Sequence, residues 1–415
     1  MTVPASGAKS RQASFRFIFA LSVMNAVSFG IMIPVLPNLI KSFAGGDTAA
    51  ASEWNVLFAS AWGLMQFASG PILGVMADRY GRRPVLLLSM FGLAADFLFM
   101  ALAPGLWWLF AGRLLNGMTA ASFSTANAYL ADVTPPQDRA RAFGLMSSAF
   151  SFGFILGPAL GGALGEIDLR LPFFVAAGLT FANWLYGLFI LPESLPPERR
   201  VHRFDWSKAN PIGALRLLRS APGLPSLAGV AFLFQLAHMV LPAIFVLYTG
   251  HRYGWSTGTI GLTMMLTGVL GVIVQSMLIG PVVRRIGERR AVLLGAAAGA
   301  VGFAIYGWAP NGWLYLSAAP IFAFINFLMP GLQALMTRRL GPSQQGQLQG
   351  ANASMAGVAA ILGPLIFGEA FAWSLRQEGW NAPGLAIYLA SAMMVLAFAL
   401  ALRSAKVPEP EPQPA

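Results

Sequence analysis

Cysteine and charge are scarce in this sequence of 415 residues. The chain contains no cysteine, so no disulfide bond can form. Only 10% of its residues are charged and 56% are hydrophobic, whereas about 25% of the residues of a typical soluble domain are charged. A soluble fold of this size with so little charge would expose large apolar patches and aggregate. The composition therefore indicates a membrane protein.

Signatures of enzymes are absent as well. The sequence has no Walker loop that would bind ATP, no Cys/His spacing typical of a metal site, and no Ser–His–Asp arrangement. We therefore expect no catalytic residue, no cofactor and no metal ion, and any transport would need a power source other than direct ATP hydrolysis.

Long apolar runs dominate what is present. A helix needs about 20 apolar residues to cross the hydrocarbon core, and the lack of strict alternation excludes a barrel. The first run follows basic residues but is too long for a signal peptide. Twelve spans are predicted, at 15–38, 54–77, 84–103, 107–131, 142–165, 171–191, 223–248, 257–281, 291–309, 313–337, 347–372 and 383–402.

Basic residues are distributed unevenly around these spans. With the N-terminus inside, the cytoplasmic segments hold 22 of the 27 Lys and Arg residues, counting Arg16 at the start of the first span, and four fall in outer loops. The positive-inside rule then predicts that both termini are cytoplasmic. The net charge of +11 is explained by this insertion pattern and not by nucleic-acid binding.

The chain also repeats itself at one constant offset. Five pairs of landmarks are each separated by 206 residues, which we call the repeat offset: Gly81 and Gly287, Pro104 and Pro310, Trp107 and Trp313, Gly144 and Gly350, and ILGP at 155–158 and 361–364. Such a repeat predicts two six-helix halves with a substrate site between them. The predicted limits are 1–191 and 223–402 for the halves, 192–222 for a cytoplasmic linker, and 403–415 for a disordered tail.

Several motifs are similar to those of the major facilitator superfamily, and within it to the tetracycline efflux family of drug/proton antiporters. The resemblance runs nearly end to end. It rests on GIMIPVLP (30–37), DRYGRRPVLLL (78–88), GRLLNG (112–117), GFILGPALGG (153–162), RYGW (252–255), GERRAVLLG (287–295) and QQGQLQG (344–350).

This resemblance implies a major facilitator fold and proton-coupled efflux of tetracycline-like or other amphipathic drugs by alternating access. Two alternatives stay open: a proton-coupled or passive transporter of a small metabolite, and a membrane sensor that transports nothing. We expect a multi-pass protein of the bacterial inner membrane that acts as a monomer on a drug-like substrate and protons, with no nucleic-acid partner.

A charged loop after the second span is the first candidate site. Asp78 can bond arginines, and Asp132 at the end of the fourth span lies at the same membrane level and is able to accept Arg82. The predicted gate comprises Gly74, Asp78, Arg79, Gly81, Arg82, Arg83 and Asp132. These charges serve either as a latch that releases when the halves move, or only as determinants of insertion.

A stripe of small residues in the fifth span is the second candidate. Its spacing permits close contact with another helix, and a proline adds a point at which the helix can kink. The residues that match the antiporter motif are Gly153, Gly157, Pro158, Gly161 and Gly162. Ordinary close packing in a helical bundle is the alternative explanation.

Ionisable groups inside a membrane are costly and therefore are candidates for function. Asp96 is the one carboxylate deep within a predicted span, and Arg113 of the next, antiparallel span lies at comparable depth. Such a pair serves either in proton coupling or as a static ion pair. His238 in the seventh span is a further candidate proton carrier, or a packing residue.

The chain departs from the tetracycline-pump pattern at three positions. Asn25, Gly271 and Gly299 stand where those pumps carry Asp, His and Asp, so proton movement would depend on Asp96. Buried amides mixed with aromatic residues suit a large amphipathic ligand, although each amide alone is able to bridge two helices. The predicted substrate-binding residues are Asn25, Gln66, Asn116, Asn127, Gln235, Gln275, Asn326 and Gln333.

Overall fold

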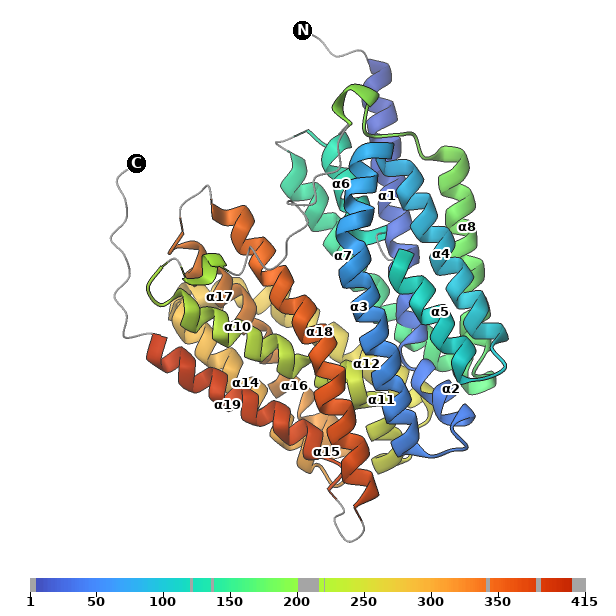
Figure 1. Cartoon of the computed structure of the whole chain (residues 1–415). Helices are drawn as coiled ribbons and strands as arrows, with labels where there is room; N and C mark the ends of the chain where they lie inside the picture. Colours follow the sequence, from blue (N-terminus) through green and yellow to red (C-terminus); the bar gives the residue numbers. More distant parts are fainter. Residues whose placement is uncertain are drawn as a thin grey trace. The chain divides into compact units, whose positions relative to one another are not determined.

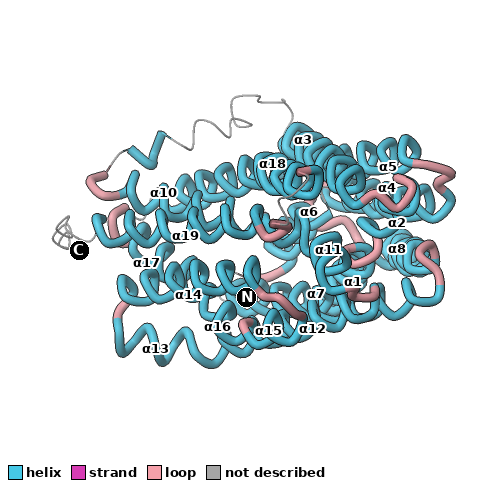
Figure 2. The backbone as a smooth tube through the Cα atoms, turned by 90° about the horizontal axis from the view of Figure 1, so that it is seen from below, coloured by secondary structure: helices cyan, strands magenta, loops and turns pink. Residues whose placement is uncertain are grey.

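The computed structural model describes residues 5–119, 122–135, 138–200, 216–219, 221–340, 344–377 and 382–404. In these ranges the chain is almost entirely helical and contains no strand, as Figure 2 shows. Most of the predicted linker and the predicted tail from residue 405 onward lie outside the described residues.

The described helices are arranged as labelled in Figure 1. The first half of the chain contains α1 (Ala5–Met32), α2 (Leu36–Phe43), α3 (Thr48–Tyr80), α4 (Arg82–Leu102), α5 (Leu106–Thr119), α6 (Ser122–Val133), α7 (Arg139–Ile167), α8 (Leu171–Ile190) and the short η2 (Pro197–Arg199). The second half contains η4 (Arg216–Arg219), α10 (Leu224–His238), α11 (Val240–Tyr253), α12 (Thr257–Ile273), the π-helical segment η5 (Val274–Leu278), α13 (Ile279–Ile286), α14 (Glu288–Trp308), α15 (Gly312–Ser317), α16 (Ala319–Ala323), η6 (Phe324–Phe327), α17 (Leu328–Thr337), α18 (Gln345–Arg376) and α19 (Leu385–Ser404).

Eleven helical stretches in the described part of the chain are long and apolar enough to cross a membrane. They correspond to eleven of the twelve predicted spans. The predicted span at 107–131 is the exception, because residues 120–121 between α5 and α6 lie outside the described residues. The prediction of an all-helical membrane fold is confirmed. The number of predicted spans, twelve, agrees approximately with the eleven found in the described residues.

The sequence repeat is visible in the helices themselves. Moving α4 along the chain by the repeat offset gives the bounds of α14, and each of these helices follows a glycine with a positive φ angle. Gly81 has φ +110° and Gly287 has φ +79°, a conformation that residues with a Cβ rarely adopt. The same sharp turn is therefore built twice.

The chain divides into two compact units that exchange short segments. The first unit contains residues 1–46, 61–209 and 255–265, and the second contains 47–60, 210–254 and 266–415. The repeat offset carries 47–60 onto 253–266, so the two exchanged segments correspond in the repeat. Because the units divide α3 and α12, the sequence-based limits of the halves stay a prediction.

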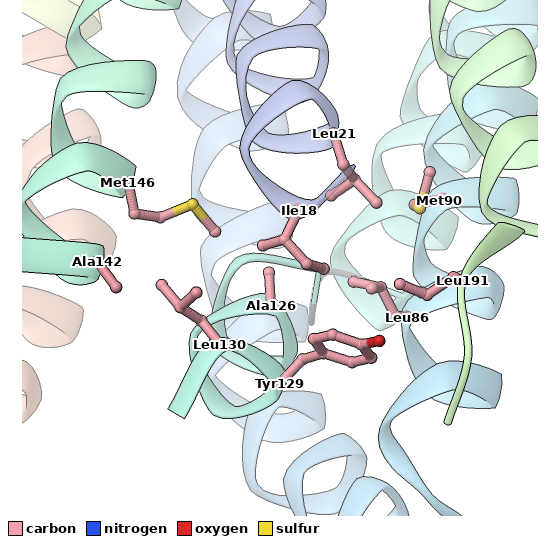
Figure 3. Close-up of a cluster of buried hydrophobic side chains, with 10 residues drawn as sticks. All are labelled: Ile18, Leu21, Leu86, Met90, Ala126, Tyr129, Leu130, Ala142, Met146 and Leu191. Atoms are coloured by element: carbon pink, nitrogen blue, oxygen red, sulfur yellow. The ribbon is translucent and has the colours of Figure 1, made fainter. Parts of the chain in front are cut away.

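A cluster of buried apolar side chains packs several helices of the first unit against one another, as Figure 3 shows. Its members come mainly from α1, α4, α6 and α7, and Tyr129 lies among them. The Tyr129 hydroxyl donates a hydrogen bond to the Pro192 carbonyl oxygen at 2.9 Å, which ties the segment after α8 to this cluster. A buried hydroxyl without such a partner would destabilise the fold.

Candidate functional site

The structure brings Asp96 of α4 and Arg113 of α5 together inside the first unit. The Arg113 Nη1 atom lies 3.5 Å from the Asp96 Oδ2 atom, and the two residues, Arg113 and Asp96, are 5% and 1% exposed. The lack of a side chain at Gly112 of α5 leaves space for the Asp96 carboxylate, since a Cβ on Gly112 would lie 2.9 Å from Asp96 Oδ1. The two predicted residues therefore form a buried ion pair.

Neither oxygen of Asp96 accepts a hydrogen bond from any described residue. The 3.5 Å contact is close enough for electrostatic attraction but does not satisfy the geometry of a hydrogen bond. A buried carboxylate usually accepts several hydrogen bonds, because its charged form is costly without them. Asp96 is thus held near a positive charge while its lone pairs stay available.

The partners of Arg113 are weak acceptors. Its Nη1 atom contacts the Met32 sulfur at 3.3 Å, and its guanidinium lies 5.4 Å from the centre of the Trp62 ring. The Trp62 indole N–H donates to Asn116 Oδ1 at 2.6 Å, which fixes the orientation of the ring. A sulfur atom and an aromatic face hold the cation without neutralising it. Asn116, predicted to bind substrate, is here engaged in positioning Trp62.

Four charged residues meet near the ends of α3, α6 and α8 and the start of α4, and we call them the charged cluster. Arg82 contacts Asp78 at 2.5 Å and Asp132 at 3.3 Å. Glu193 accepts hydrogen bonds from the backbone N–H groups of Arg82 at 2.8 Å and Arg83 at 3.2 Å. A carboxylate at this position satisfies unpaired N–H groups and complements the helix dipole.

The rest of the predicted gate has mixed surroundings. Arg83 donates to the Leu188 carbonyl oxygen at 2.7 Å, and the Arg79 guanidinium lies 5.3 Å from the centre of the Tyr80 ring. A Cβ on Gly74 would meet no described atom within 4 Å, so no described contact requires a glycine at this position. At Gly81, by contrast, a Cβ would lie 2.2 Å from Glu193 Oε2.

The second unit repeats the central contact of the charged cluster with the charges exchanged. Arg82 and Asp132 correspond, at the repeat offset, to Glu288 and Arg338. Glu288 and Arg338 also form an ion pair, so the contact is kept while the acid and the base have changed places. The sequence reasoning missed this pair, although the repeat offset applied to Asp132 would have found it.

The predicted antiporter motif packs α7 against α1 inside the first unit. A Cβ on Gly153 would lie 2.4 Å from the Cβ of Ala26, and one on Gly157 would lie 2.6 Å from the Cα of Gly30. A Cβ on Gly161 would lie 2.0 Å from the carbonyl oxygen of Ile31. These glycines are required by backbone contact between the two helices.

A second face of the same motif packs against the start of α12. A Cβ on Gly162 would lie 2.7 Å from the Thr257 carbonyl oxygen, and one on Gly261 would lie 2.2 Å from the Pro158 carbonyl oxygen. Glu166 at the end of α7 accepts a hydrogen bond from the Gly258 N–H at 2.7 Å. The motif therefore joins α7 to two helices at once.

The predicted substrate amides are divided equally between the units. In the first unit, Asn25 accepts a hydrogen bond from Asn183 of α8 at 3.4 Å, whereas Gln66 and Asn127 are half-buried. Asn183 is completely buried and its own Oδ1 has no described partner. Asn183 was missed, although it too is an amide within a predicted span, 171–191, that contains aromatic residues.

In the second unit only some of these amides are engaged. Gln333 accepts a hydrogen bond from Asn352 of α18 at 2.9 Å, and Asn326 donates to the Ala323 carbonyl oxygen at 2.9 Å. Gln235 has a buried Nε2 atom with no described partner, and Gln275 is exposed on the π-helical segment η5. Gln333 thus bridges two helices, whereas the Gln235 amide nitrogen has no described partner.

His238 lies in the second unit and has aromatic surroundings. Its ring stacks on Phe234 at 5.6 Å and on Phe322 at 6.5 Å between ring centres. Its Nδ1 atom is buried and has no described partner. The structure therefore does not group His238 with Asp96 and Arg113 in one unit.

Two of the positions that depart from the tetracycline-pump pattern, Gly299 and Gly271, have different neighbours in the structure. A Cβ on Gly299 would lie 2.8 Å from Met394 Cε and 2.9 Å from Ile325 Cδ1, so apolar packing occupies the space of an aspartate. A Cβ on Gly271 would lie 3.7 Å from the Asn326 amide nitrogen, and an amide thus faces the position where the pumps carry histidine.

Comparison with known proteins gives consistent matches along most of the chain. The profile of the Major Facilitator Superfamily matches residues 18–364 and 227–415. The class C tetracycline resistance protein of Escherichia coli is 39% identical over 91% of this chain and 94% of its own length. The class G protein of Vibrio anguillarum is 36% identical over 86% of this chain and 90% of its own length.

Solved structures show the same fold at lower identity. The nucleoside transporter NupG aligns with a TM-score of 0.76 at 14% identity, covering 95% of this chain and 99% of its own. The human organic anion transporter MFSD10 aligns with a TM-score of 0.67 at 24% identity, covering 94% and 99% of the two chains.

The two glycine turns provide a matched pair of substitutions. Gly81→Ala should lower the thermal unfolding temperature of the detergent-purified protein more than Gly287→Ala. Both changes place a Cβ at a positive φ and a ψ of 160°, at a cost of about 1–3 kcal/mol, but only the first also displaces Glu193 from the start of α4. Equal losses would show that Glu193 contributes nothing to the charged cluster.

Proposed function

Because this chain belongs to the major facilitator superfamily, and its relatives in that family include the tetracycline resistance proteins, we propose that it exports tetracycline-like, amphipathic drugs in exchange for protons. Membership of the family makes it a secondary transporter that moves small molecules across a membrane, and not an enzyme. The proton, the drug and the direction of transport are the parts that we propose.

The observation that carries the proposal is the buried pair of Asp96 and Arg113. A carboxylate inside a membrane is costly to keep charged, and Asp96 has no hydrogen-bond donor at either oxygen among the described residues. Its charged form is stabilised mainly by Arg113, at 3.5 Å. A carboxylate of this kind is suited to bind a proton and to release it when its surroundings change.

The proposed cycle couples this exchange to conformation. When Asp96 takes up a proton, the attraction to Arg113 is lost, and the guanidinium keeps only the Met32 sulfur and the Trp62 ring. Since these are weak partners, Arg113 then favours any arrangement that offers a better acceptor. Loss of the proton restores the ion pair, and so the two protonation states favour different arrangements of α4 and α5.

The departures from the family pattern restrict this coupling to few residues. Asn25 and Gly299 cannot titrate, and apolar ends of the Met394 and Ile325 side chains lie beside the Gly299 position. His238 lies in the other unit between two phenylalanines, so we assign it to the lining of the ligand site. Asp96 then carries the exchanged proton alone.

The choice of drug rests on the relatives and on the amides. Three tetracycline resistance proteins are 39%, 36% and 33% identical to this chain over most of its length. Gln235 offers an unpartnered buried amide nitrogen on α10, the helix that also carries Phe232 and Phe234. Such a mixture suits a planar ligand with many oxygen atoms. The relatives also disfavour the alternatives of a metabolite transporter and a sensor.

The gating, orientation and location follow from the same proposal. The charged cluster and the Glu288–Arg338 pair would close the cytoplasmic side, and the contacts of α7 with α1 and α12 would form the interface that the antiporter motif shapes. We place both termini in the cytoplasm of a bacterium, with the protein acting as a monomer in the inner membrane.

Replacement of the carboxylate tests the coupling. Asp96→Asn should abolish tetracycline uptake driven by a pH gradient into inside-out vesicles, because the amide cannot take up and release the proton. Binding of the drug to the purified protein should persist. Glu369→Gln, which removes an exposed carboxylate of α18, serves as the control and should transport normally. Transport by the Asp96→Asn protein at the normal rate would refute the assignment.

Two glutamines of the second unit should respond differently to substitution. Gln235→Ala should change the relative affinities for several tetracyclines at an unchanged unfolding temperature, since its amide has no described partner to lose. Gln333→Ala should lower the unfolding temperature and affect all compounds alike, because it leaves Asn352 unpaired. Drug-binding titrations and thermal unfolding of both variants distinguish these effects, and the reverse pattern would contradict the assignment.

A further inference from the structure

A second polar group lies on the same face of α4 as Asp96. Ser89 precedes Asp96 by seven residues, which is close to two helical turns, so the two side chains project in nearly the same direction. Ser89 is 2% exposed, and its hydroxyl has no hydrogen-bond partner among the described residues. A buried hydroxyl in this position requires an explanation, because leaving it unpaired is costly.

Thr119 of α5 places a third polar group between these two. Gly92 lies on the same face of α4, between Ser89 and Asp96, and a Cβ on Gly92 would lie 2.3 Å from the Thr119 hydroxyl oxygen. The glycine therefore lets the hydroxyl lie against the backbone of α4. The Thr119 hydroxyl has two carbonyl acceptors in its own helix, Leu115 at 3.1 Å and Asn116 at 3.3 Å, and its oxygen is still able to accept.

The spacing of these groups suits a chain of hydrogen bonds. Seven residues of helix correspond to about 10.5 Å, and the Thr119 hydroxyl beside Gly92 divides this length into steps of about 4.5 Å and about 6 Å. One water molecule with a hydrogen bond on either side spans such a step. Water at these places would also give Ser89 and Asp96 the partners that they otherwise lack.

We propose that Ser89 and Thr119, with bridging water, relay the proton between Asp96 and the Arg82 end of α4. The relay rests on the proposed exchange of protons by Asp96. In the direction of release, the O–H bond of the Asp96 carboxyl breaks and its proton passes to a water molecule. Each hydroxyl then accepts one proton on its oxygen and gives up its own, so that one proton leaves the relay at Ser89, toward the Arg82 end of α4, and each hydroxyl again carries one proton.

The relay ends at an apolar barrier. One turn beyond Ser89, Val85 packs against Leu73 and Ala77 of α3 in a small buried cluster, and the charged cluster lies beyond it. At the other end of the relay, the charged side chain that contacts Asp96 among the described residues is that of Arg113. The barrier would keep the proton from leaking until α3 and α4 separate, as an exchanger requires.

A buried hydroxyl outside the relay provides the control. Thr180 of α8 is completely buried, and its hydroxyl also has no described partner. Thr180→Val therefore removes a group of the same kind without interrupting the path. If Ser89 and Thr119 serve only in packing, replacing Thr180 should have an effect of the same size.

Infrared spectroscopy of the reconstituted protein measures proton arrival at Asp96 without requiring transport. After a rapid drop in pH, the carbonyl band of the protonated Asp96 carboxyl, identified by its absence in Asp96→Asn, should appear. Ser89→Ala and Thr119→Val should slow its appearance by about tenfold or more, whereas Ser89→Thr and Thr119→Ser should keep the normal rate. Gly92→Ala, which displaces the Thr119 hydroxyl, should also slow it.

The outcomes separate the relay from the proposed function. Normal rates in Ser89→Ala and Thr119→Val, or equal slowing by Thr180→Val, would overturn the relay and leave the coupling role of Asp96 intact. If the wild-type protein shows no band that depends on Asp96, the proposed exchange of protons fails, and the relay fails with it.

Discussion

The electrostatic contact between Asp96 and Arg113 is the interaction on which the account of this protein depends. Two charges in a membrane interior stay only if they support each other, yet the 3.5 Å contact gives the carboxylate no hydrogen bond. Gly112 brings α5 close enough for the contact, and Trp62 and Met32 hold the guanidinium with weak acceptors. The pair is thus stable enough to persist and weak enough to respond to one proton.

Duplication has kept the architecture of the chain while its chemistry has changed. The turns at Gly81 and Gly287 and the helices that follow them coincide at the repeat offset, and so do the segments exchanged between the compact units. The ion pair of Arg82 with Asp132 recurs as Glu288 with Arg338, with opposite charges. Among the described residues of the two units, the deeply buried ion pair, Asp96 with Arg113, lies in the first unit.

Much of the fold was predictable from sequence, because the length of each apolar run follows directly from the thickness of a bilayer. Depth along two antiparallel helices also sufficed to pair Asp96 with Arg113. Glu193 was not predictable in this way, since it reaches the start of α4 from a segment far along the chain, after α8. The amides show the same limit: Gln333 and Gln235 are alike in sequence, and only their neighbours distinguish a helix bridge from a free amide.

The proton exchanged when the drug binds is the quantity that tests this account most directly. Calorimetric titration of the purified protein with tetracycline, in two buffers that differ in ionisation enthalpy, counts the protons released on binding. We expect the wild-type protein to release protons and the Asp96→Asn variant to bind the drug and release none. Equal release by both proteins, or heats independent of the buffer in the wild type, would contradict the claim that Asp96 couples proton and drug.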